Sequence, residues 1–228
     1  MKKDFFWQKA CFLKYDSYKL CPREFIGGVL ILLTTIVTMK EYAMNMHEKN
    51  TIIKRELSLN QVIEELSMLA RKNFPVEEVT GFFQTTITPL SQINQHLFFS
   101  PLKYTRHLVH RSHDFELLYM CWSPGQKSPV HGHEGEKCWF RVEQGALQIV
   151  NYELAEINKP RKMSVDRATT GFVDGPADIH LVENHTTERA ISLHLYARPF
   201  DVCDVYDVNN QQVTKKKLSY DSVCSSFI

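Results

Sequence analysis

The chain has 228 residues, which is enough for one domain or for one domain with an appended segment. Its 27 basic and 26 acidic side chains leave a formal charge of +1, which argues against a nucleic-acid-binding protein that works through a basic surface. Hydrophobic residues make up 43% of the sequence, which excludes a disordered chain. The six cysteines form no disulfide framework, so we expect a reducing compartment, the cytoplasm.

Residues 1–50 are predicted to form an N-terminal extension, separate from a domain at residues 51–228. Basic side chains precede an uncharged run of 15 residues from Phe25 to Met39, which is shorter than the roughly 17–25 residues of a membrane-spanning helix. The alternatives are a poorly ordered, dispensable extension and a short membrane anchor. We favour the former and expect no membrane partner, because later methionines are alternative starts that would remove the apolar run.

Two helices are predicted after this extension. Ser58 and Gln61 have the spacing of a capping box. Apolar residues follow it at helical spacing: Leu59, Val62, Ile63, Leu66, Leu69 and Ala70. Pro75 is expected to end this helix, and a second short helix is predicted from Val76 toward Phe83. The two helices would form a cap at the start of the domain.

From about residue 101 the pattern changes to short strands separated by turns. Strands are predicted at 115–122, 137–143, 146–154 and 190–196, with a hairpin-like junction at Gln144-Gly145. In the last strand Ser192, His194 and Tyr196 alternate, so their side chains share one face. Many short strands favour a mainly β fold, a sandwich or a barrel.

The histidines are the most informative feature of the sequence. His131 and His133 are two residues apart, so on a strand both imidazoles lie on one face. This pair alone would fit a structural role equally well. His180 is a third candidate ligand, and three neutral imidazoles suit a first-row ion such as Fe(II), Zn, Cu or Ni.

The spacing around these histidines resembles the cupin superfamily. The first cupin motif, G-x5-H-x-H-x(3,4)-E-x6-G, matches Gly125 through Gly145, except that Cys138 stands where a glutamate ligand is usual. His180 and Asn184 match the end of the second motif, H-x3-N. A cysteine in place of the carboxylate further resembles cysteine dioxygenase, a mononuclear non-haem iron enzyme of the cupin fold.

The resemblance to cysteine dioxygenase covers most of residues 57–205. It rests on the segments YTRHLV (104–109), CW (121–122), HGHEGEKC (131–138), IHLVEN (179–184), SLHLY (192–196) and PFDVC (199–203). It implies a mainly β, cupin-type small β-barrel (jelly roll) with N-terminal α-helices. It also implies an Fe(II)-dependent, monomeric enzyme that oxidises L-cysteine with O2 to cysteine sulfinate, in cysteine catabolism and taurine synthesis.

The same resemblance assigns the metal and the substrate. By resemblance, His131, His133 and His180 bind Fe(II), and three neutral ligands leave positions open for substrate and O2. Arg106 would hold the substrate carboxylate, because a guanidinium binds a carboxylate through two parallel hydrogen bonds. Tyr104 would lie near the same carboxylate.

Cys138 and Tyr196 resemble the family's thioether pair, a protein-derived cofactor. The phenol of Tyr196 would donate to the substrate or to oxygen, His194 would hydrogen-bond that phenol, and Ser192 would extend the chain of hydrogen bonds. The family often has a cis bond before a proline after this tyrosine. Arg198 stands in place of that proline, so we expect no cis bond there.

Two other functions fit the same residues. One is a related thiol dioxygenase that acts on a different small thiol, such as 3-mercaptopropionate, and the other is a non-catalytic, metal-binding cupin. Four further histidines are interpreted as surface or loop residues: His107, His110, His113 and His185. The run Lys215 to Lys217 is interpreted as a solvated patch.

Overall fold

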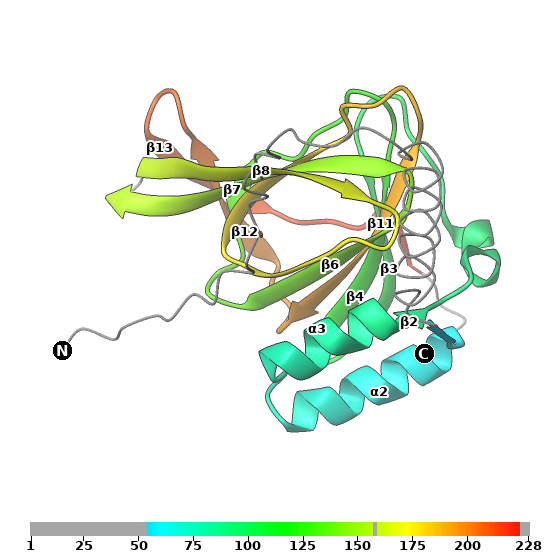
Figure 1. Ribbon diagram of the computed structural model, residues 1–228. Helices are drawn as coiled ribbons and strands as arrows, with labels where there is room; N and C mark the ends of the chain where they lie inside the picture. The colour runs from blue at the N-terminus through cyan, green and yellow to red at the C-terminus, as the bar shows by residue number, and fades with distance from the viewer. Residues whose placement is uncertain (1–53, 157–158, 224–228) are drawn as a thin grey trace, which may run out of the picture. The chain divides into compact units, whose positions relative to one another are not determined.

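The computed structural model describes residues 54–156 and 159–223, in which two helices precede two six-stranded sheets (Figure 1). The helices are α2 (Leu59–Arg71) and α3 (Val76–Thr85), and two short strands beside them, β1 (Arg55–Glu56) and β2 (Thr86–Ile87), pair in parallel. Within the described ranges, no helix has the length and hydropathy to span a membrane. The predicted extension, residues 1–50, lies outside them.

The two sheets have the strand orders β13-β12-β5-β10-β7-β8 and β14-β3-β4-β11-β6-β9. The first sheet comprises β5 (Val130–Gly132), β7 (Ala146–Glu156), β8 (Lys159–Thr169), β10 (Ile179–Glu183), β12 (Val202–Asp207) and β13 (Gln212–Lys217). The second comprises β3 (Thr105–Arg111), β4 (Glu116–Trp122), β6 (Lys137–Gln144), β9 (Val173–Ala177), β11 (Ala190–Ala197) and β14 (Ser222–Val223). The mainly β jelly roll is therefore confirmed, although each sheet keeps its own edge strands and the barrel does not close.

The N-terminal helices are confirmed. The backbone N–H of Gln61 donates to Ser58 Oγ at 3.3 Å, and the N–H of Ser58 donates to Gln61 Oε1 at 2.8 Å, which completes the capping box. Helix α2 ends at Arg71, and Pro75 caps the start of α3 rather than ending α2. Figure 1 shows α2 and α3 side by side, and their apolar side chains belong to one core cluster with the second sheet.

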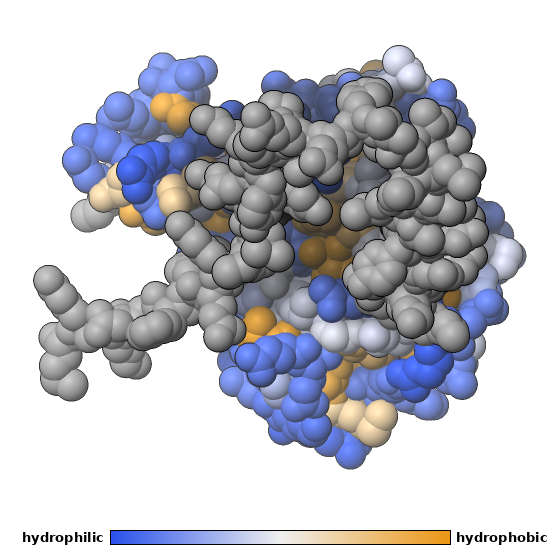
Figure 2. All heavy atoms as spheres, viewed as in Figure 1, coloured by the Kyte–Doolittle hydropathy of each residue, from blue (hydrophilic) through white to orange (hydrophobic). Residues whose placement is uncertain are grey.

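The second sheet is buried on both faces. Along β4, alternate side chains pack toward the helices: Leu117, Tyr119 and Cys121. The others pack between the two sheets: Leu118, Met120 and Trp122. This double burial explains why the sequence of β4 is an uninterrupted apolar run instead of an alternating one. In contrast, the face drawn in Figure 2 is largely hydrophilic around the ends of β7, β8 and β13.

The prediction of a hairpin-like junction at Gln144-Gly145 is wrong, because β6 and β7 belong to different sheets. At Gly145 the chain crosses from the second sheet to the first. The backbone φ of Gly145 is +76°, and a Cβ atom there would lie 2.6 Å from the carbonyl oxygen of Arg189. Only glycine fits this crossing without strain.

The surface interpretation of His107 is also wrong. His107 is fully buried on β3, where its Nδ1 lies 2.7 Å from Ser222 Oγ and its Nε2 lies 2.9 Å from Thr105 Oγ1. Burial lowers its pKa. The cover comes from the C-terminal strand β14, which pairs with β3 from more than a hundred residues away. His113 and His185 are exposed, as predicted, and His110 is half-buried.

Candidate functional site

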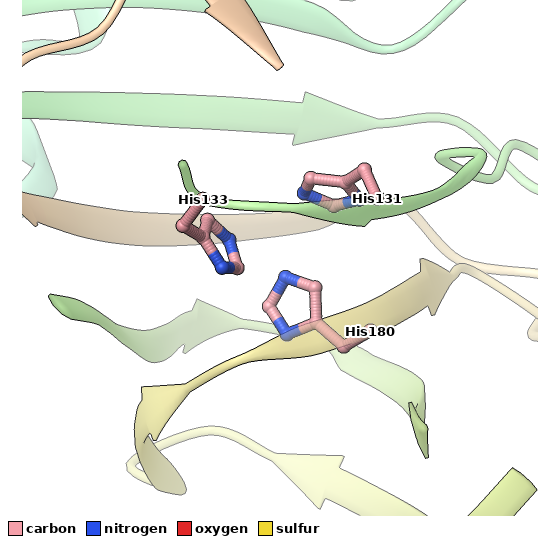
Figure 3. Close-up of side chains that lie close together, drawn as sticks. All are labelled: His131, His133 and His180. Carbon is pink, nitrogen blue, oxygen red and sulfur yellow. The ribbon is translucent and has the colours of Figure 1, made fainter. Parts of the chain in front are cut away.

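Three histidines converge between two strands of the first sheet. His131 lies on β5 and His133 directly after it, while His180 lies on β10 and is the register partner of His131. Figure 3 shows the three rings facing one another, and their candidate ligand atoms all lie within 4.8 Å of one another. Gly132, between the first two, faces away: a Cβ there would lie 3.7 Å from the ring of Tyr206.

The surroundings of these imidazoles hold them in the form that binds metals. Nδ1 of His131 lies 3.0 Å from the carbonyl oxygen of Pro129, and Nδ1 of His133 lies 3.0 Å from that of Asp178. When Nδ1 donates to a carbonyl, Nε2 keeps its lone pair for an ion. Burial lowers the pKa of His131 to about 3 and that of His180 well below its usual value, so both are neutral donors at pH 7. The donor set therefore fits a first-row divalent ion.

A cavity beside the histidines contains Arg106. The cavity is lined by His131, His180, Arg106, Tyr104, Tyr196, His194 and mostly apolar neighbours. Arg106 is the second residue of β3, and its side chain is only 9% exposed. Its Nε and Nη2 atoms have no hydrogen-bond partner among the described residues. A buried guanidinium with free donors is suited to an anionic ligand, above all a carboxylate.

The buried Glu116 and two half-buried C-terminal residues, Tyr220 and Asp221, hold Arg106 in place. Glu116 Oε1 lies 3.6 Å from Arg106 Nη2, and the Tyr220 hydroxyl donates to Glu116 Oε2 at 2.6 Å. The guanidinium carbon of Arg106 lies 5.7 Å from the centre of the Tyr220 ring. The backbone N–H of Arg106 donates to Asp221 Oδ2 at 2.9 Å. Sequence reasoning missed these groups, because no local pattern links β3 to residues 220–221.

Ring stacking and hydrogen bonds connect four side chains in sequence: Tyr104, Trp122, Ser192 and His194. Tyr104 stacks on Trp122 with ring centres 4.5 Å apart. Trp122 Nε1 donates to Ser192 Oγ at 2.9 Å, and Ser192 Oγ lies 2.8 Å from His194 Nε2. The other nitrogen of His194 is buried without a hydrogen-bond partner in the described ranges. The structure thus contains the expected Ser192–His194 contact, whereas no hydrogen bond joins Nδ1 of His194 to Tyr196.

Cys138 and Tyr196 are neighbours across two strands. They are register partners on β6 and β11, and both are buried. Partners of this kind have Cβ atoms about 4.5–5.5 Å apart, which brings a cysteine sulfur close to a tyrosine ring. Burial raises the pKa of both groups, so the thiol and the phenol are protonated at neutral pH. The bond after Ala197 is not among the cis peptides found in the described residues, as expected.

Other cavity residues were not identified from the sequence as parts of the site. They are Met120, Ser128, Pro129, Val182, Cys203, Lys216 and Leu218. The solvated-patch interpretation is therefore incomplete: Lys216 is exposed but also lines the cavity. Asn184, the last residue of the second motif, is structural, because its Nδ2 donates to the carbonyl oxygens of Trp122 at 3.0 Å and Glu188 at 2.8 Å.

Comparisons with known proteins agree with this geometry. The family model described as cysteine dioxygenase type I matches residues 46–209. Cysteine dioxygenase type 1 of Rattus norvegicus is 28% identical over 171 residues, which cover 72% of this chain and 84% of the relative. The human protein of that name is 27% identical over 182 residues, which cover 76% of this chain and 91% of the relative.

Similar solved structures share less of the chain. A crystal structure from Thermus thermophilus has a TM-score of 0.40 and 22% identity, over 47% of this chain and 95% of that one. A protein from Klebsiella pneumoniae with a double-stranded β-helix domain has a TM-score of 0.42 and 16% identity, over 50% of this chain and 87% of that one.

Proposed function

Because the chain belongs to the cysteine dioxygenase type I family, we propose that it is an Fe(II)-dependent cysteine dioxygenase that converts L-cysteine and O2 to cysteine sulfinate. The observation that carries this proposal is the buried guanidinium of Arg106, which has free donors and lines the same cavity as His131 and His180. A carboxylate-binding cation beside a metal-binding cluster is what a small amino-acid thiol requires. The cluster alone would fit many metalloproteins.

Iron held by His131, His133 and His180 would supply the site where the thiol loses its proton and O2 is activated. The chain's own residues bind and orient the substrate. Arg106 would donate two parallel hydrogen bonds to the carboxylate, which fixes the direction in which the thiol points. The Tyr196 hydroxyl, in the same cavity, would donate a hydrogen bond to the bound substrate.

The rest of the cavity wall excludes water. Trp122 is fully buried behind the stacked Tyr104 ring, and Met120, Val182 and Phe200 supply further apolar surface. A dry wall strengthens the bond between Arg106 and a carboxylate and limits the loss of reactive oxygen species to solvent.

The proposed reaction is tested by oxygen uptake of the iron-loaded full chain with L-cysteine, with cysteine sulfinate measured in parallel. We expect one sulfinate for each O2 consumed. Bound iron without oxygen uptake from any thiol would contradict the proposal and favour a metal-binding cupin without catalytic activity.

A thioether between Cys138 and Tyr196 is expected to form during turnover. The S–H bond of Cys138 and one ring C–H bond of Tyr196 would be replaced by a C–S bond, with two electrons and two protons passing to O2. The intact mass should therefore fall by two hydrogen atoms, and Cys138→Ser should abolish the change. Cys121→Ser, which alters another buried thiol, serves as the matched control and should keep it. A wild-type mass that never changes after turnover would show that the pair is not joined.

Glu116→Gln is expected to raise the KM for L-cysteine about tenfold, as for the loss of one hydrogen bond or ion pair to a charged group. The value of kcat should change little, because Glu116 holds Arg106 and does not reach the reacting atoms. Asp201→Asn is the control, since Asp201 binds the outer side of Arg111 and is exposed. Steady-state kinetics check the result, and an equal rise of KM for cysteamine, which has no carboxylate, would argue against this positioning role.

A further inference from the structure

Two adjoining cavities share one cationic wall. The cavity with the histidines and an outer cavity both include Tyr104, Arg106, Lys216 and Leu218 in their linings. The outer cavity adds Lys103 and Lys217. No aspartate or glutamate lines either cavity among the described residues. An anion in either cavity therefore meets positively charged side chains and no carboxylate in the cavity lining.

Two of these four cations, Arg106 and Lys103, have acidic partners outside the cavities. Arg106 shares Glu116 with Arg111, and Lys103 Nζ lies 2.6 Å from Asp221 Oδ1. Lys216 has no ion-pair partner within the part of the chain that the structure describes. Of the two cations that line the cavity with the histidines, Lys216 is thus the one whose charge is not balanced.

Its neighbour Lys215 behaves differently. Lys215 Nζ lies 2.8 Å from Glu134 Oε2 and 2.9 Å from Asp204 Oδ1, and it lines neither cavity. The strand register places Lys216 opposite Cys203 of β12, a buried residue that also lines the cavity with the histidines. Burial raises the pKa of Cys203, while the positive charges of Arg106 and Lys216 oppose that rise. The electrostatic field of both cations therefore reaches this cavity-lining side chain.

We propose that Lys216 is a specificity-determining residue, which beside Arg106 raises the activity of the site toward thiols of net negative charge relative to its activity toward L-cysteine. This inference rests on the proposed function and names a further determinant of substrate choice at the same site. L-cysteine has no net charge at pH 7, whereas 3-mercaptopropionate has a carboxylate and no amine and is an anion. Arg106 binds the carboxylate of either thiol. The unbalanced charge of Lys216 attracts only the anion as a whole and disfavours a positively charged amine nearby.

The test compares kcat/KM for 3-mercaptopropionate and for L-cysteine in three iron-loaded proteins: wild type, Lys216→Met and Lys215→Met. We expect Lys216→Met to lower the ratio of the two values about three- to fivefold, as for a partly exposed charge. The effect should shrink when salt is raised from about 0.01 M to about 0.15 M, since the Debye length falls. Lys215→Met, one residue away with the same change of charge, should leave the ratio as in the wild type.

Three other outcomes would contradict either the role of Lys216 or the proposed function. An unchanged ratio in Lys216→Met, with L-cysteine still turned over, would overturn the role of Lys216 and leave the proposed function standing. An equal change in Lys215→Met would overturn it too, because the effect would then come from the general charge of β13. No turnover of any thiol by the wild-type protein would contradict the proposed function itself, and the role of Lys216 would fall with it.

Discussion

Arg106→Gln is expected to lower kcat/KM for L-cysteine by about two to three orders of magnitude. The variant removes both donors that would hold the carboxylate and leaves Glu116 buried beside a neutral amide, and truncating one partner of a buried charge pair costs about 2–5 kcal/mol. Cysteamine has the same thiol and amine without the carboxylate, so its turnover should change by less than about threefold. The measurement is steady-state oxygen uptake with the two thiols on one enzyme preparation.

Cysteamine is the internal control for the Arg106 prediction. A general loss of structure or of iron would reduce the turnover of both thiols alike, so an equal loss would contradict the carboxylate-binding role. Arg111→Gln is the matched variant. It changes the other arginine that binds Glu116, and Arg111 does not line the cavity, so its effect on L-cysteine should be much smaller.

His180→Ala is expected to remove bound iron and to abolish turnover with every thiol. The three imidazoles come from two paired strands, and in the described residues they are the one group of potential ligands that could hold an ion. Two remaining imidazoles should bind iron at least about tenfold more weakly, because even the loss of an outer contact to a ligand costs 10–100-fold in affinity. Iron content per chain, measured after equal loading and desalting, checks the first half of this prediction.

His113→Ala is the matched control for the iron measurement, because His113 is exposed and lies in a turn away from the cavity. It should retain the iron content and the activity of the wild type. Full iron content in His180→Ala would contradict the assignment of His180 as a ligand, even if activity were lost.

The sequence predicts the local elements well, because their causes are local. The capping box at Ser58, the alternation in β11 and the two-residue spacing of His131 and His133 are all properties of short segments. The resemblance that the histidine and glycine motifs carry also implies the jelly roll and assigns His180 to the same metal site. The structure contains these elements, and the predicted bounds of the helices and strands agree with the observed ones within a few residues.

What the sequence does not predict depends on contacts between distant segments. The C-terminal residues Tyr220 and Asp221 reach β3 and hold Arg106, and β14 buries His107. The local sequence at Gly145 cannot distinguish a hairpin turn from a crossing between sheets, because a glycine with positive φ occurs in either one. Lys216 belongs to a charged run, and only the pairing of β12 with β13 places it at the cavity.

The central claim, that both oxygen atoms of O2 are transferred to the sulfur of L-cysteine, is tested most directly with oxygen-18. The iron-loaded full chain is given L-cysteine under labelled O2 in ordinary water, and the cysteine sulfinate is analysed by mass spectrometry. The account predicts sulfinate that carries two labelled atoms. Sulfinate with unlabelled oxygen, or oxygen consumption that yields only the disulfide cystine, would contradict it.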